Sequence, residues 1–104
     1  MVTLVKTKTE FDSTLSNNTL VAVDFTASWC GPCKMIGPKF EAMAAQFPSI
    51  KFIKVDVDEN SETSEALGIA AMPTFFFYAN GEKMKEVVGA SEDKLREALQ
   101  ELSA

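Results

Sequence analysis

The two cysteines of this chain lie three positions apart, in Cys30-Gly31-Pro32-Cys33, and they directly follow the only tryptophan, Trp29. A disulfide between residues this close closes a very short loop, so loop-closure entropy makes it a weak structural crosslink. Two such thiols are better suited to exchange, in which one sulfur attacks a foreign disulfide and the other resolves the mixed disulfide. We therefore predict redox chemistry at this pair.

Two other interpretations of the pair are weaker. A zinc site needs further ligands, but the chain has no other cysteine and no histidine, so only carboxylates or a second copy could complete it. A purely structural disulfide suits a secreted protein, whereas the segment Met1–Lys6 lacks the charged start and the longer apolar run of a signal peptide. We therefore expect no signal peptide and a cytoplasmic location, with the nucleus left open as a second one.

The size and charge of the chain narrow its class. With 104 residues, 46% of them hydrophobic, the chain can bury one core, and we expect a single domain over residues 1–104. Its net charge of −5 argues against nucleic acid or an anionic membrane as a partner, because phosphate contacts need clustered Lys and Arg. We expect a monomer that binds neither.

Strand and helix patterns alternate along the chain. Apolar and β-branched runs predict strands at Val2–Val5, Leu20–Thr26, Ile50–Val57, Thr74–Tyr78 and Lys83–Val88. Capping residues and apolar spacing predict helices after Thr7, from the cysteines to about Phe47, from Asn60 to Leu67, and after Ser91. This order predicts an α/β fold, a mixed sheet with helices on both faces.

The predicted position of the cysteines assigns them different roles. Cys30 lies at a helix start, where unpaired amides and the helix dipole favour a thiolate, so it should be the attacking sulfur. Cys33 lies one turn further in, with fewer routes to solvent, and suits the resolving role. Pro32 is compatible with a first helical turn. Because Gly31-Pro32 supplies no cation that would stabilise the reduced form, the sequence favours a reductant over an oxidant.

A carboxylate interrupts the apolar run of the second predicted strand. Strand alternation puts Asp24 on the face opposite Val21, Val23 and Phe25. If it is buried, its pKa should rise, and it could exchange a proton with Cys33 through a water. The alternative is an exposed or salt-bridged strand residue. Lys54, on the next strand, is either its partner or a solvated lysine.

Two further residues could belong to the site. Pro73 precedes a strand, and nothing local requires the Met72-Pro73 bond to be cis. Trp29 either packs in the core or forms an aromatic rim beside the sulfurs. Its position next to Cys30 and its amphipathic ring favour the rim.

Four stretches of the chain together resemble the thioredoxin family, and in particular its eukaryotic cytosolic members, most closely the fungal ones. They are 24–34, Lys54–Asp58, Met72–Thr74 and Val88–Ala90, in the order and spacing that the family shows. The resemblance implies a thioredoxin fold, with a central five-stranded mixed sheet flanked by four helices. It also implies a cis peptide bond at Pro73 and a buried acid–base group at Asp24 with Lys54 as its neighbour.

The same resemblance implies a function, a general reductant of protein disulfides that works through reversible oxidation of the Cys30/Cys33 pair. It implies an apolar surface that receives disulfides, made of Trp29, Gly31, Pro32, Met72, Pro73 and Gly89. Electrons would come from NADPH through thioredoxin reductase, so no bound cofactor is expected. Expected substrates are peroxiredoxins and reductases. The chain departs from many vertebrate members in having no cysteine outside the pair.

Two competing functions remain at this point. The fold could serve as a binding module in which the dithiol is incidental, although a scaffold does not need its sulfurs. The chain could also be an oxidase or isomerase of the secretory pathway, against which the Gly-Pro dipeptide and the expected absence of a signal peptide argue.

Overall fold

The apolar run that predicts a central strand forms β2 (Leu20–Thr26), the middle strand of a five-stranded sheet in the computed structural model, which describes all residues 1–104. The strand order is β1-β3-β2-β4-β5, and the remaining strands are β1 (Thr3–Leu4), β3 (Lys51–Asp56), β4 (Thr74–Ala79) and β5 (Glu82–Val88). β1, β3 and β2 are parallel, whereas β4 and β5 run antiparallel to their neighbours. The mixed sheet is as expected.

The four helices begin where capping side chains predict. They are α1 (Lys8–Asn17), α2 (Gly31–Ala44), α3 (Ser61–Leu67) and α4 (Glu92–Ser103). The side-chain oxygens of Thr7, Asn60 and Ser91 each accept a hydrogen bond from the backbone amide three residues on, which satisfies one free donor of α1, α3 and α4. No helix combines the length and apolar character that a membrane span requires.

The end of α2 corrects the sequence-based expectation. The helix stops at Ala44 rather than near Phe47. Pro48 explains the difference, because a residue that precedes proline is disfavoured in the α conformation and Phe47 is that residue. Phe47 nevertheless packs against the core from the loop after the helix, so its apolar spacing reports burial and not helix.

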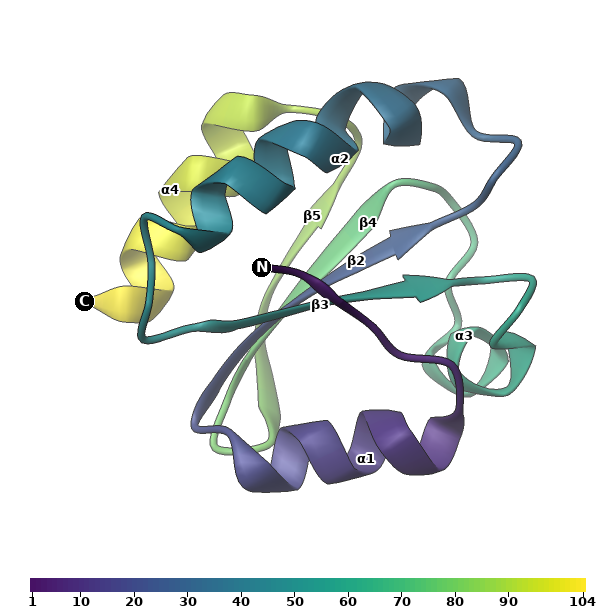
Figure 1. Ribbon diagram of the computed structural model, residues 1–104, viewed down its shortest axis with the longest axis horizontal. Coiled ribbons are helices and arrows are strands. Elements are labelled where there is room, and N and C mark those ends of the chain that lie inside the picture. The colour runs from purple at the N-terminus through teal and green to yellow at the C-terminus, as the bar shows by residue number, and fades with distance from the viewer.

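The helices cover the sheet in two pairs, with α2 and α4 on one face and α1 and α3 on the other (Figure 1). Ala22 of β2 contributes to the core under α2 and α4, whereas Val21, Val23 and Phe25 contribute to the core on the other face. Because side chains alternate along a strand, Asp24 lies on the α2 side with Ala22. Both faces of β2 are therefore covered, which explains its nearly continuous apolar run.

A tight turn at Asn80 and Gly81 connects β4 to β5, whose end residues Ala79 and Glu82 are paired. Asn80 and Gly81 both adopt left-handed backbone conformations, with φ of 54° and 81°. This pair of positive φ values is the geometry of a type I′ turn, for which Asn-Gly is the preferred sequence.

Candidate active site

Cys30 and Cys33 form a disulfide at the start of α2, with their Cα atoms 5.3 Å apart. Cys30 is the N-cap residue, and its Sγ accepts a hydrogen bond from the backbone amide of Cys33 at 3.2 Å. Pro32 lies in the first turn, where its missing amide leaves no donor unpaired. In the reduced protein, a thiolate at Cys30 would lie where this amide and the helix dipole stabilise negative charge.

Exposure hardly separates the two sulfurs. Cys30 is 5% exposed and Cys33 is 4% exposed, so shielding from solvent does not by itself assign the attacking and resolving roles. Their surroundings differ instead. Cys30 Sγ accepts a hydrogen bond from the Cys33 amide, whereas Cys33 lines a pocket that Cys30 does not line.

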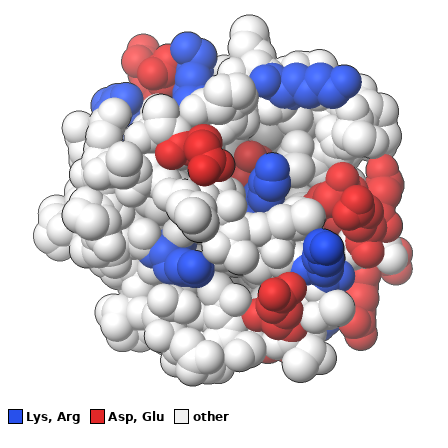
Figure 2. Space-filling view, in the orientation of Figure 1, with Lys and Arg blue, Asp and Glu red and all other residues white.

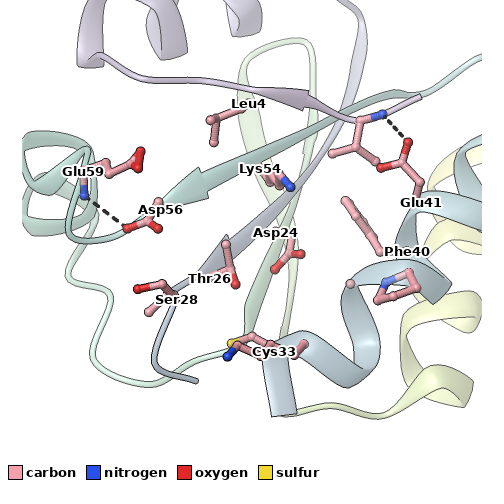
Figure 3. Close-up of a pocket in the computed structure, with 15 residues that line it drawn as sticks. Leu4, Asp24, Thr26, Ser28, Cys33, Phe40, Glu41, Lys54, Asp56 and Glu59 are labelled. Carbon is pink, nitrogen blue, oxygen red and sulfur yellow. Dashed lines mark hydrogen bonds between the residues drawn. The ribbon is translucent and has the colours of Figure 1, made fainter. Parts of the chain in front are cut away.

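That pocket, of about 480 Å³, opens between the start of α2 and the strands β2 and β3 (Figure 3). Asp24 and Lys54 line it together with Cys33, and in Figure 3 Asp24 lies between the other two. The space-filling view shows this face hollowed near its centre, with acidic and basic side chains side by side at the hollow (Figure 2). The pocket therefore brings Cys33, Asp24 and Lys54 together beneath the start of α2.

Asp24 is buried, which decides between the two interpretations of this carboxylate. It is 3% exposed, it lies in register between Lys54 of β3 and Phe75 of β4, and its Oδ1 has no hydrogen-bond partner. Burial raises the pKa of Asp24 from an ordinary 3.8 to about 7, and the positive charge of Lys54 offsets part of that rise. A carboxyl with this pKa can donate or accept a proton at neutral pH.

Trp29, the neighbour of Cys30 in the chain, lies at the surface and not in the core. The side chain is 65% exposed, and its indole Nε1 donates a hydrogen bond to Asp58 Oδ2 at 2.8 Å. Sequence reasoning assigned no role to Asp58. The signal was available, because β2 and β3 are parallel neighbours, and residues that follow such strands meet at the same edge of the sheet.

The loop before β4 lies against the cluster that contains the disulfide. Met72 packs against the small cluster that contains both cysteines, and its peptide bond to Pro73 is cis, as the family resemblance implies. The amide of Gly89 donates to the Pro73 carbonyl at 2.9 Å, and Gly89 has a φ of 103°, which disfavours residues with a side chain.

The structure therefore gathers the predicted surface residues around the disulfide, although they differ in exposure. Gly31 and Pro32 are exposed, Met72 and Gly89 are partly exposed, and Pro73 is buried. No group of three His, Cys, Asp or Glu side chains is arranged to hold a metal ion.

Comparison with protein families places this site in a known group. A family model described as Thioredoxin matches residues 2–101. The chain belongs to the thioredoxin family. It is 54% identical over 102 residues to thioredoxin of Geodia cydonium and 50% identical over 99 residues to thioredoxin-1 of Schizosaccharomyces pombe. Each match covers 95% of this chain and 96% of the relative.

Solved structures of thioredoxins agree. The structure of Plasmodium falciparum thioredoxin superposes with a TM-score of 0.94 at 45% identity, over 96% of this chain and 98% of the other. Malassezia sympodialis thioredoxin gives 0.93 at 44% identity, over 99% and 94%. The predicted thioredoxin fold is confirmed. The chain is a dithiol–disulfide oxidoreductase with protein-disulfide reductase activity, and Cys30 and Cys33 are its redox pair.

Proposed function

We propose that this member of the thioredoxin family is a general, monomeric reductant of protein disulfides. The observation that carries the proposal is the hydrogen bond from the Cys33 amide to Cys30 Sγ at the N-cap of α2. This amide and the helix dipole stabilise a thiolate at Cys30 moderately, and no cation lies between the cysteines to stabilise it further. A reduced form that is only moderately stabilised gives up its electrons readily, which suits a reductant.

The proposed cycle begins when the Cys30 thiolate attacks one sulfur of a substrate disulfide. The substrate S–S bond breaks, a mixed disulfide forms, and the other substrate sulfur leaves as a thiolate that takes up a proton. Cys33 then loses its proton, and its thiolate attacks Cys30 Sγ. This second step releases the reduced substrate and leaves the Cys30–Cys33 disulfide, so two electrons pass from the protein to the substrate.

Asp24 is proposed to take the proton of Cys33 in the second step. The two side chains line the same pocket, and Asp24 lies between Cys33 and Lys54 there (Figure 3). Lys54 is proposed to tune this transfer, because its charge lowers the pKa of Asp24 and so favours the carboxylate that accepts the proton.

The proposed docking surface surrounds the disulfide and consists of Trp29, Gly31, Pro32, Met72, Pro73 and Gly89. Its exposed indole and its glycines would receive an extended chain without steric hindrance. We propose peroxiredoxins and reductases as substrates. One solved relative, 32% identical with a TM-score of 0.93, comes from work on thiol resolution in a yeast mitochondrial 1-Cys peroxiredoxin by the glutathione and thioredoxin systems.

Recycling is proposed to come from thioredoxin reductase, which would return electrons from NADPH to the disulfide and so support electron transport and cell redox homeostasis. The reductant needs no bound cofactor for this, because electrons pass between sulfurs. We propose a cytoplasmic location, with the nucleus open, because a reducing compartment keeps such dithiols supplied with electrons.

Insulin reduction tests the proposal. With dithiothreitol as the recycling reductant, the parent protein should accelerate precipitation of the insulin B chain, and Cys30→Ser should not. Met84→Ser, a surface change on β5, serves as the matched control and should retain full activity. A Cys30→Ser variant as fast as the parent would refute the proposed role of Cys30.

Two further measurements separate a reductant from an oxidase or isomerase. In glutathione buffers, the pair should remain a disulfide even at a large excess of the reduced form. Half-reduction in a mildly reducing buffer would instead identify an oxidant. NADPH consumption in the presence of a eukaryotic thioredoxin reductase should depend on both cysteines.

A further inference from the structure

One carboxylate oxygen accepts two backbone hydrogen bonds in the turn that follows β3. Asp56 Oδ1 accepts hydrogen bonds from the backbone amides of Asp58 at 2.9 Å and Glu59 at 3.1 Å, and Figure 3 shows the second of these bonds. The backbone carbonyl of Asp56 also accepts from the Asn60 amide at 2.8 Å. Asp56 thus determines the path of the chain through the next four residues.

This turn is connected to the active site at two points. The Val57 amide donates to the Thr26 carbonyl at 2.9 Å, which attaches the turn to the end of β2 just before the cysteine loop. Asp58 Oδ2 then accepts the indole N–H of Trp29 at 2.8 Å. Because Trp29 is mostly exposed and forms no aromatic pair, this hydrogen bond is its principal polar anchor beside Cys30.

We propose that Asp56 is a positioning residue for substrate binding, which acts through Asp58 to hold the Trp29 ring beside the disulfide. The inference rests on the proposed function, in which Trp29 forms part of the docking surface. A side chain that is already oriented loses less conformational freedom when a substrate binds. The effect should therefore fall on substrate affinity and leave the sulfur exchange steps nearly unchanged.

Asp56 also lines the pocket with Asp24 and Lys54, so its negative charge could act on proton transfer instead. Two substitutions distinguish the effect of Asp56 as a hydrogen-bond acceptor from the effect of its negative charge. Asp56→Asn removes the charge but keeps an Oδ1 that can accept hydrogen bonds from the amides of Asp58 and Glu59. Asp56→Glu keeps the charge but displaces the oxygens by one methylene group. If Asp56 acts by positioning, Asp56→Asn should bind insulin as the parent does and Asp56→Glu should bind it more weakly. If Asp56 acts through its charge, the opposite should be found.

The experiment is the single-turnover oxidation of pre-reduced protein by increasing concentrations of insulin. Asp56→Glu, Asp56→Ala and Asp58→Ala should each raise the half-saturating insulin concentration about threefold to tenfold, the range expected for one lost hydrogen bond. The limiting rate should stay within about twofold, and Asp56→Asn should match the parent. If Asp56 acts through Asp58, the double variant Asp56→Ala/Asp58→Ala should be no worse than Asp58→Ala alone.

A structural readout accompanies the kinetics. The single indole N–H resonance of Trp29 should shift and exchange faster with solvent in the Glu and Ala variants, but not in Asp56→Asn. Glu62→Ala, which removes one charge from the first turn of α3, controls for net charge and should leave both readouts unchanged.

Three results would overturn the inference. They are an unchanged indole resonance in Asp56→Glu, multiplicative effects in the double variant, and an Asp56→Asn variant as weak as Asp56→Ala. Failure of the proposed function would look different, because the parent itself would then fail to reduce insulin.

Discussion

Replacing Asp24 by Asn should remove the main pH dependence of stability between pH 5 and 8.5. The parent buries an ionisable carboxyl whose Oδ1 has no partner, and its pKa rises to about 7 in the folded protein. Asn has nearly the same shape and keeps an oxygen at the same place, but it cannot ionise. The comparison therefore isolates the cost of placing a charge in this site.

The magnitude follows from linkage. A raised folded-state pKa means that the folded protein binds the proton more tightly, so the stability from this group is complete below 3.8 and is lost as pH rises to and beyond about 7. The difference between these values corresponds to about 4 kcal/mol in total, at roughly 1.36 kcal/mol per pH unit. Between pH 5 and 8.5 the parent should lose about 3 kcal/mol of this amount.

Urea unfolding of the oxidised proteins at pH 5, 7 and 8.5 measures the effect. The oxidised form keeps the cysteines from titrating, and the absence of histidine leaves no side chain with an ordinary pKa in this range. Burial raises the pKa of Tyr78 to about 12, outside the range. The parent should become less stable relative to Asp24→Asn as pH rises.

The refuting result is a free-energy difference between parent and variant that stays constant, within about 0.5 kcal/mol, across this range. It would mean that Asp24 does not titrate there, and the acid–base role proposed for it would lose its physical basis. A confirmed stability effect should be accompanied by slower insulin reduction in Asp24→Asn at neutral pH. Unchanged rates at every pH would show that Asp24 takes no part in proton transfer.

Three other changes follow from the structure. Lys54→Met removes the positive charge that lowers the pKa of Asp24. In this variant, the pH range over which the protein loses folding stability should therefore extend upward. A range that stays in place or moves down in urea unfolding would contradict the effect assigned to Lys54. Gly89→Ala should destabilise the protein by roughly 1–3 kcal/mol in urea unfolding, because a φ of 103° strains any residue with a Cβ. No atom lies within 4 Å of the added Cβ, so the loss would come from backbone strain and not from a clash. Equal stability of variant and parent would refute this strain. Phe40→Ala, which empties a fully buried position on the inner face of α2, should cost about 3–5 kcal/mol by thermal or urea unfolding, and a loss below 1 kcal/mol would show that the core collapses into the space.

Features that depend on chemistry within a few residues can largely be predicted from the sequence. The spacing of Cys30 and Cys33 predicts an exchangeable disulfide, because a bridge over so short a loop has little structural use. The capping residue Ser91 and the turn Asn80-Gly81 predict their elements, because their side chains or backbone preferences act within a few residues. The predicted end of α2 near Phe47 is wrong because apolar spacing reports burial, whereas Pro48 disfavours the helical conformation at Phe47.

Tertiary structure decided what depends on residues far apart in the chain. Asp24 is buried because the neighbouring strands place Lys54 and Phe75 beside it and α2 covers this face of the sheet. This burial in turn raises its pKa. The anchor of Trp29 comes from Asp58, twenty-nine residues away, through two strands that end at one edge of the sheet. The physical reason is common to both. Desolvation and hydrogen bonding between distant groups depend on their separation in space, which sequence spacing specifies only within a turn or an element.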